Sequence, residues 1–251
     1  MSSAWRVLGA SVTGESHAAS GAPCQDACAW VVRGDGQLVV AVSDGAGSAS
    51  RGDVGARVAV ASVMASLRET PDPIGPGVLE AALDVAIAAV HAEADALGVA
   101  PRELAATLIL AAAGTGAAAA VQIGDGAAVV LGHGESPQAL TRPPVGEFVN
   151  ETTFLVTPGA RGRAQRGDWR GAVSALVVFS DGLQRLALRM PSGEPHAPFF
   201  RPLAEFAATA EPESGSRDLA TFLLSERVAS RSDDDRSLIV AVLARGEARA
   251  P

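Results

Sequence analysis

The sequence predicts an α+β fold in which two antiparallel sheets form a central β-sandwich flanked by helices, in α-β-β-α layers. Apolar runs with strand character occur near the start, in the middle and at the end of the chain. Two helical patterns follow the first group of strands, and two more precede the last strand. Strands and helices therefore do not alternate, and this order favours a layered sandwich over βαβ units.

The first part of the chain is predicted to contain a strand, a hairpin and two helices. The hairpin turn contains Asp35-Gly36, a favoured pair for tight turns. A Pro-rich segment, 70–76, separates the two helices. The expected elements are a strand over Trp5–Val12, a polar loop over Gly14–Pro23, hairpin strands over Asp26–Val32 and Leu38–Val42, and helices over Val54–Leu67 and Val78–Leu97.

From Thr107 onward the apolar period changes to that of strands. We expect strands over Leu108–Ala112, Ala118–Ile123 and Ala127–Leu131, an irregular segment over Pro137–Phe154 with a short strand at Thr153–Val156, and a polar, mobile loop over Arg161–Trp169. The remaining expectations are a strand over Val173–Phe179, a short helix over Leu183–Leu188, helices over Leu203–Thr209 and Ser216–Ser230, a strand over Ser237–Leu243 and a frayed tail over Gly246–Pro251.

Composition limits the function classes. The chain has 251 residues and no repeat or linker, so we expect a single domain over 1–251. Its formal net charge of −8 makes a nucleic-acid partner unexpected. No Lys occurs, which excludes a Walker-type phosphate loop, a Schiff base and a lysine general base. Cys24 and Cys28 support neither a zinc ribbon nor a disulfide framework, and we expect reduced, packed thiols.

The sequence indicates a cytoplasmic protein with no membrane partner. The N-terminus lacks the cationic and apolar stretches of a signal peptide. The segment 104–123 is nearly uncharged and long enough to span a bilayer, but Gly114-Thr115-Gly116 interrupts it. Two adjacent strands joined by a tight turn explain this segment better.

Three short motifs place an aspartate beside a glycine where a predicted strand ends. Ser43-Asp44-Gly45 follows the run Leu38–Val42, and Ser180-Asp181-Gly182 follows Val173–Phe179. A looser version, Gly124-Asp125-Gly126, separates two further strands. A glycine at this point allows a sharp turn and a close approach of the backbone to a ligand.

Further acids at Asp26 and in Asp233-Asp234-Asp235 complete a set of hard oxygen ligands. Such ligands select Mg²⁺ or Mn²⁺ over zinc or copper. Two such ions about 3.5–4 Å apart would hold a bridging water, lower its pKa and direct it at a phosphorus atom. Each acid also has a structural interpretation: Asp44 as a helix cap, Asp125 as a hairpin turn and Asp234 as a solvated loop residue.

In chain order, five elements resemble the metal-dependent protein phosphatases of type 2C, and flanking segments resemble a bacterial branch of that family. The five elements are Gln25-Asp26, Ser43-Asp44-Gly45, Gly124-Asp125-Gly126, Ser180-Asp181-Gly182 and Asp234-Asp235-Arg236-Ser237, and the flanking segments are GESHAASGAPCQDA, AATLILA and GEFVNETTFL. The resemblance implies a β-sandwich with a two-metal centre at one end. It also implies hydrolysis of phosphoserine and phosphothreonine by a metal-bound water.

The resemblance assigns roles to individual residues. It implies Mn²⁺ or Mg²⁺, two ions and a third more weakly held. The implied ligands are Asp26, Asp44, Asp181 and Asp234, the Gly45 carbonyl, and Asp125 together with Asp181 for the third ion. Asp44 and Asp181 would thereby hold the attacking water, and no protein nucleophile is implied. The segment 143–169 matches the position of the family's mobile flap.

Three positions depart from the family pattern. Gly21 stands where an arginine often holds the substrate phosphate, Ala46 where some members have a histidine, and Gln25 where glutamate is common. We expect His17 and Arg51 to substitute as proton donor and phosphate-holding residue, respectively. A catalytically weak or inactive module that binds phosphoproteins is the alternative. For the enzyme, the expected partner is a phosphorylated protein, either a serine/threonine kinase or its target.

Overall fold

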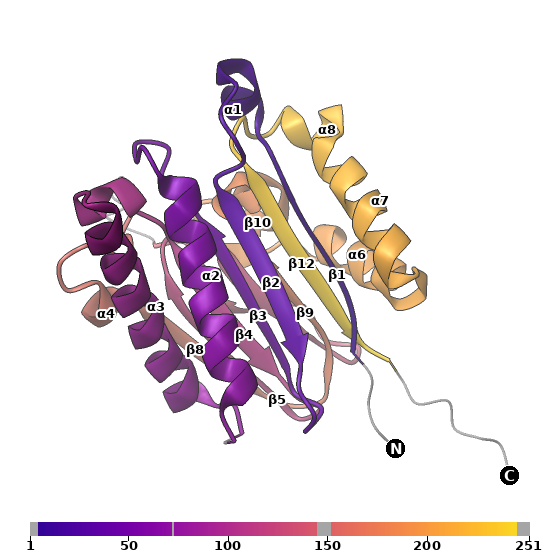
Figure 1. Ribbon diagram of the computed structural model, residues 1–251. Coiled ribbons are helices and arrows are strands. Elements are labelled where there is room, and N and C mark those ends of the chain that lie inside the picture. The colour runs from indigo at the N-terminus through magenta and orange to yellow at the C-terminus, as the bar shows by residue number, and fades with distance from the viewer. Residues whose placement is uncertain (1–4, 72, 145–151, 245–251) are drawn as a thin grey trace, which may run out of the picture.

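The computed structural model describes residues 5–71, 73–144 and 152–244. Two five-stranded antiparallel sheets pack against each other, as Figure 1 shows. In spatial order, the first sheet contains β1 (Trp5–Val12), β12 (Arg236–Leu243), β9 (Val173–Phe179), β6 (Ala127–Gly132) and β7 (Gln138–Thr141). The second contains β2 (Asp26–Val32), β3 (Leu38–Asp44), β4 (Leu108–Ala113), β5 (Ala117–Ile123) and β8 (Gln165–Arg170).

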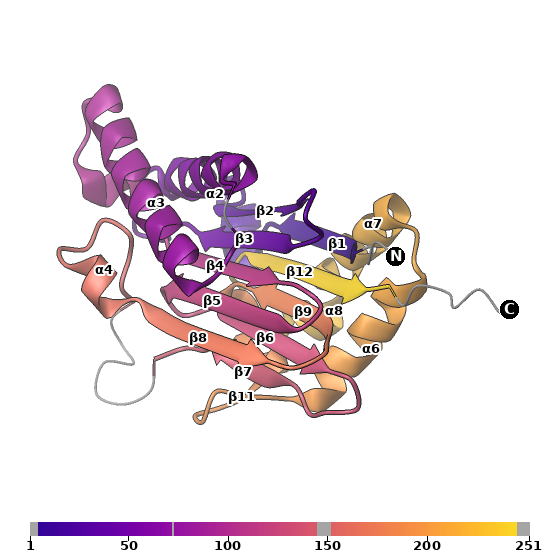
Figure 2. The same ribbon diagram turned by 90° about the horizontal axis from the view of Figure 1, so that it is seen from below.

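Helices cover the outer faces of both sheets (Figure 2). The helices α2 (Gly52–Glu69) and α3 (Pro76–Leu97) lie on the second sheet, and α6 (Ala197–Thr209) and α7 (Pro212–Leu224) lie on the first. The short elements are α1 (Glu15–Ser20), η1 (Pro101–Leu104), α4 (Ala160–Arg163), η2 (Asp181–Leu183), α5 (Gln184–Ala187), β10 (Leu188–Arg189), β11 (Glu194–Pro195) and α8 (Glu226–Ala229). The predicted α-β-β-α layers are confirmed.

Three apolar clusters fill the spaces between the layers. One packs α2 and α3 on the second sheet, for example Val63 and Leu83 on Val39. Another lies between the sheets and is rich in alanine and valine from their inner faces. The third packs α6 and α7 on the first sheet, with Phe200 and Leu219 against Phe179. Burial of this apolar surface is the main force that holds the layers together.

The structure differs from the sequence-based elements at several places, and the expected helix Ser216–Ser230 is divided into α7 and α8. The expected loop after β1 contains α1, and the segment expected to be irregular contains β7. Thr153–Val156 is not a strand: Thr157 N–H donates to the Phe154 carbonyl and closes a turn. Residues 165–170, expected as a loop, form β8, an edge strand whose side chains alternate between half-buried and exposed.

The nearly uncharged segment 104–123 is not a membrane helix. It contains the end of η1 and the hairpin strands β4 and β5, whose turn is closed by Gly114 N–H donating to the Ala117 carbonyl. In the described parts of the chain, every helix is too short or too polar to cross a membrane. The tail expected over Gly246–Pro251 and part of the expected flap, 145–151, lie outside the described residues.

Candidate active site

Four aspartates from different strands meet at one end of the sandwich. β2 begins at Asp26 and β3 ends at Asp44, and the two residues are direct partners in the antiparallel ladder. Asp181 follows β9, and Asp125 lies in the turn between β5 and β6. The carboxylates of Asp44, Asp125 and Asp181 offer oxygens that all lie within 4.8 Å of one another.

An open cavity of about 470 Å³ lies over these carboxylates. Its lining includes Asp44, Gly45, Asp125, Asp181 and Asp234, as well as Ser16, His17, Ala46, Gly47, Ser48, Thr152, Phe154 and Asp233. The acids of the two sheets and the start of β12 therefore share one solvent-accessible space. Asp26 is 8% exposed and lies in the floor beside Asp44 rather than in the lining.

Thr107 fixes the end of β3. Its hydroxyl accepts a hydrogen bond from the Asp44 backbone N–H at 3.0 Å, and its own N–H donates to the Asp44 carbonyl at 2.8 Å. The hydroxyl of Ser43 donates to the Thr107 carbonyl at 2.5 Å. Three hydrogen bonds to one threonine thus hold the backbone that presents the Asp44 carboxylate.

Ser180 connects the two sheets beneath the cavity. Its hydroxyl donates to Asp26 Oδ2 at 2.7 Å and accepts from the Ser237 N–H at 2.9 Å. Ser180 is only 2% exposed, so its hydroxyl has little access to water as an alternative partner. The serine before Asp181 therefore orients the carboxylate of Asp26, which belongs to the opposite sheet.

The turn that carries Asp125 is held by two glutamines and a threonine. The side-chain amide of Gln122 donates to the carbonyls of Gly124 and Gly126, and that of Gln184 donates to the Asp125 carbonyl. Thr152 donates its hydroxyl to Asp125 Oδ2 at 3.0 Å. These contacts fix the position of Asp125.

Asp235, which the sequence indicated only as a member of the acidic cluster Asp233-Asp234-Asp235, supports the backbone around the site. It is 1% exposed. Its carboxylate accepts from the N–H groups of Gly14 at 2.7 Å and Gln25 at 2.5 Å, and Oδ2 lies 2.9 Å from His17 Nδ1. Buried Arg236 donates to the Asp234 carbonyl and to that of Leu223 in α7. The acidic cluster before β12 is therefore a structural anchor as well as a source of the cavity-lining residues Asp233 and Asp234.

Burial and mutual repulsion raise the pKa values of the clustered carboxyls. Burial raises the pKa of Asp26 to about 7, despite hydrogen bonds to its charged form. Burial and the charges of Asp125, Asp234 and Asp26 raise the pKa of Asp181 to about 8. The pKa of Asp44 is raised well above its ordinary value by burial and by the nearby Asp26 and Asp181. Burial also raises the pKa of Asp125.

These residues fit a hard divalent cation. Within the described part of the chain, the buried oxygens Asp26 Oδ1 and Asp181 Oδ1 have no hydrogen-bond partner. Arginine is absent from the described lining, so no guanidinium offsets the clustered negative charge. These carboxylate oxygens lack hydrogen-bond partners and repel one another. A bound Mg²⁺ or Mn²⁺ would coordinate them and offset their repulsion.

Close backbone packing explains the glycines that follow two of the aspartates. A Cβ atom on Gly45 would lie 2.4 Å from the Gly52 carbonyl carbon, and one on Gly182 would lie 2.2 Å from the Asp235 carbonyl oxygen. The second contact brings the segment after β9 directly against the segment before β12. Glycine at position 182 therefore lets the segments that carry Asp181 and Asp234 approach each other, and glycine at position 45 lets the end of β3 pack on the start of α2.

The structure gives the conformation or contacts of the residues at the three positions, 21, 25 and 46, where the sequence departs from the family pattern. Gly21 adopts a left-handed conformation at the end of α1, and Ala46 lines the cavity without a polar side chain. In the orientation that satisfies its neighbours, the Gln25 amide donates to the carbonyls of Gly45 at 3.0 Å and Ala46 at 3.2 Å. Gln25 thus supports the Gly45 carbonyl directly.

His17 and Arg51, expected to replace the family's proton donor and phosphate-holding arginine, lie in different places relative to the cavity. His17 lines the cavity. Arg51 does not: it is exposed just before α2, where its N–H donates to the Glu103 carbonyl. The structure therefore does not bring Arg51 to the carboxylates, and no sequence signal had shown on which side of the loop it lies.

Residues 13–224 match the model of the family described as Protein phosphatase 2C. The chain is 36% identical over 252 residues to serine/threonine-protein phosphatase 3 of Escherichia coli (strain K12), covering 96% of this chain and 99% of that protein.

Solved structures share the fold. The serine/threonine phosphatase Stp1 from Staphylococcus aureus has a TM-score of 0.66 at 13% identity, covering 98% of this chain and 97% of that one. The catalytic domain of the serine threonine protein phosphatase PstP, in complex with two manganese ions, has a TM-score of 0.65 at 17% identity, covering 96% and 99%. The chain belongs to the protein phosphatase 2C family.

Proposed function

We propose that this member of the protein phosphatase 2C family is a metal-dependent serine/threonine protein phosphatase that hydrolyses phosphoserine and phosphothreonine. The observation that carries the proposal is the convergence of Asp44, Asp125 and Asp181 in one open cavity, where a buried oxygen of Asp181 lacks a partner. The name of the relative from Escherichia coli supports the same substrate class.

Two ions, Mn²⁺ or Mg²⁺, would be held by Asp26, Asp44, Asp181, Asp234 and the Gly45 carbonyl, with a third at Asp125 and Asp181. The two manganese ions in the PstP catalytic domain support this number. When bound, the ions supply a water of lowered pKa and screen the negative charge of the phosphate.

The chain's own residues hold this arrangement in place. Thr107 fixes Asp44, Ser180 fixes Asp26, and Gln25 supports the Gly45 carbonyl. Pre-set ligand positions reduce the reorganisation that the reaction needs. The cavity opens to solvent, so a phosphorylated side chain on a protein surface can enter.

His17 is our proposed proton donor to the leaving oxygen. It lines the cavity, and its Nδ1 lies 2.9 Å from the buried Asp235 carboxylate. A carboxylate at Nδ1 orients the imidazole and leaves Nε2 as the ring nitrogen available to the leaving oxygen. Ala46 has no titratable side chain, so it cannot donate this proton.

A second function, the binding of a phosphoprotein without turnover, is favoured by one observation. The described lining has no arginine to grip a phosphate, and Gly21 offers no side chain. The aspartate set argues for the enzyme, because a binding module does not need a complete set of metal ligands. In either case we propose a phosphoprotein partner, a serine/threonine kinase or its target, in the cytoplasm.

The test is hydrolysis of p-nitrophenyl phosphate and of a phosphothreonine peptide with Mn²⁺, with EDTA and with Asp44→Asn. We expect turnover that needs metal and that falls on the order of 100-fold or more in the variant, since a central charged ligand is lost. Metal binding by calorimetry without turnover of either substrate would support the binding module instead.

A further inference from the structure

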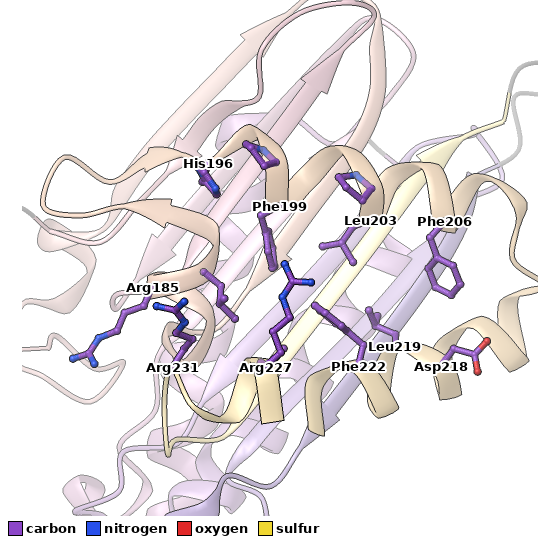
Figure 3. Close-up of a pocket in the computed structure, with 14 residues that line it drawn as sticks. Arg185, His196, Phe199, Leu203, Phe206, Asp218, Leu219, Phe222, Arg227 and Arg231 are labelled. Carbon is purple, nitrogen blue, oxygen red and sulfur yellow. The ribbon is translucent and has the colours of Figure 1, made fainter. Parts of the chain in front are cut away.

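A groove separate from the metal site runs between α6 and α7 on the outer face of the first sheet (Figure 3). It encloses about 580 Å³. Its walls are mostly apolar: Phe199, Leu203 and Phe206 come from α6, and Leu219 and Phe222 come from α7. The three α6 residues have helical spacing i, i+4 and i+7, so they line one side of the groove along its length.

One end of the groove is strongly cationic. Arg185, Arg227 and Arg231 line it, and all three are exposed. None of their side chains makes an ion pair or a hydrogen bond with any residue that the structure describes. Figure 3 shows Arg227 reaching into the groove near Phe199, with Asp218 at the opposite end. Three unpaired arginines together contrast with the net charge of −8 of the whole chain.

The cationic end is adjacent to the catalytic cavity along the chain. Asp181 and Arg185 are separated by η2 and the start of α5, which is about one helical turn, or roughly 6 Å along the axis. Arg231 precedes Asp233, which lines the cavity, by two residues, or at most about 7 Å of extended chain. A single bound chain can therefore contact both places.

We propose that this groove docks the phosphoprotein substrate through a segment that carries apolar side chains and, next to them, acidic or phosphorylated residues. The apolar side chains occupy the space between α6 and α7, and the anionic groups pair with Arg185, Arg227 and Arg231. Guanidinium groups bind carboxylate and phosphate through two parallel hydrogen bonds, which matches this chemistry. The inference rests on the proposed function and specifies which phosphoproteins it favours.

The shape of the groove favours a peptide segment over a membrane surface. Leu219 is buried and the other four apolar wall residues are half-buried between the two helices, where a flat bilayer would not reach them. A groove between two helices accepts an amphipathic segment with anchors at i, i+3, i+4 and i+7. Binding there would also raise the local concentration of the attached phosphoresidue at the metal site.

The first experiment measures binding without turnover, by fluorescence anisotropy in EDTA. The probe is a fluorescein-labelled 16-residue peptide with leucines at i, i+3, i+4 and i+7 and four glutamates at one end. Two matched peptides replace the glutamates with glutamine or the leucines with serine. We expect both to bind at least about tenfold more weakly, because each lacks one of the two contacts.

Variants of the protein locate the binding site. We expect Arg227→Glu to weaken the binding of the probe about tenfold, whereas Arg201→Glu changes that affinity less than about twofold. Arg201 is the matched control because it is exposed on the same helix α6 but does not line the groove. Equal weakening by the two variants, no weakening by either, or Arg227-dependent binding of phosphatidylserine vesicles but not of the peptide would overturn the proposal.

A second measurement connects the groove to catalysis. A phosphothreonine joined by a short linker to the glutamate end of the probe is compared with the short phosphothreonine peptide, in Mn²⁺. We expect kcat/KM to rise about tenfold for the joined substrate, and Arg227→Glu to remove that gain. Absence of turnover of p-nitrophenyl phosphate by the unaltered protein would instead count against the proposed function, while the anisotropy result would still decide the groove.

Discussion

The two Ser-Asp-Gly segments have the same sequence and end strands of different sheets, yet they support the site differently. Ser43 donates to the Thr107 carbonyl, which belongs to the neighbouring chain segment of its own sheet. Ser180 donates to Asp26 of the opposite sheet and accepts from Ser237. The first serine therefore stabilises one strand end, and the second connects the two sheets.

The glycines of the two segments differ in the same way. Gly45 packs against Gly52 at the start of the helix that follows it, whereas Gly182 packs against Asp235, far away in sequence. A short motif can thus specify a strand end and a carboxylate. Its neighbours in space decide whether it also joins distant parts of the fold.

The largest loss of stability expected from a single substitution comes from adding a methyl group at these glycines. Gly45→Ala and Gly182→Ala would each place a Cβ within 2.4 Å of backbone atoms, and we expect each to lower the free energy of unfolding by about 2–3 kcal/mol. Urea denaturation measures this change. Gly47→Ala is the control, because its Cβ would meet nothing within 4 Å.

Metal affinity is a second measurement on the two glycines. We expect both variants to weaken Mn²⁺ binding in calorimetry, Gly45→Ala by moving the carbonyl that we propose as a ligand and Gly182→Ala by displacing the segment that carries Asp234. If both variants retained normal stability, the close packing inferred for these backbones would be wrong.

A smaller difference is expected between the serines. Ser180→Ala leaves the Ser237 N–H and Asp26 Oδ2 without their partner in a buried place, and we expect a loss of about 2–3 kcal/mol in unfolding free energy. Ser43→Ala removes a single bond to a carbonyl, and we expect a loss of about 1 kcal/mol. Denaturation of both variants in EDTA measures the contrast, and equal losses would contradict the connecting role of Ser180.

A further expected effect is a dependence of stability on pH in the metal-free protein. Because the pKa of Asp26 is about 7 and that of Asp181 about 8 in the folded state, against 3.8 ordinarily, the folded protein holds protons that the unfolded chain has released. Stability therefore falls as pH rises from about 4 to about 8, by up to roughly 1.4 kcal/mol per pH unit for each group.

Urea denaturation in EDTA between pH 5.5 and 8 measures this slope. We expect Asp181→Asn to flatten it, because one of the repelling carboxyls is removed. We also expect Mn²⁺ to stabilise the protein more at pH 8 than at pH 5.5, where protons compete with the ion. A slope that is the same in the variant would show that Asp181 is not among the groups that titrate.

Much of the fold follows from local patterns. The buried strands β3, β4 and β9 are continuous apolar runs, and α2 and α3 have clear helical spacing, so their sequences alone predict them. β8 could not be predicted this way, because Gln165–Arg170 has charged residues on an exposed edge and its pairing with β5 is set by tertiary contacts.

The carboxylates of the site can be predicted from the sequence, but the residues that hold them in place by hydrogen bonds cannot. Aspartates at strand ends stand out in the sequence, and the structure brings Asp44, Asp125 and Asp181 together. Asp235 stood out only as part of an acidic cluster and Thr107 not at all, because their roles consist of hydrogen bonds to residues distant in sequence. Arg51 illustrates the opposite limit: its closeness to Asp44 in sequence did not place it at the cavity.

The position of β12 has a consequence for the order in which the protein is made. β12 lies between β1 and β9, pairing with β1 along eight residues, and Asp234 lies two residues before its first residue, Arg236. The second sheet can assemble from residues 26–170 while synthesis continues, but the first sheet cannot close until β12 has left the ribosome. The final strand therefore completes both the sandwich and the acidic site, so a partly synthesised chain cannot act on phosphoproteins.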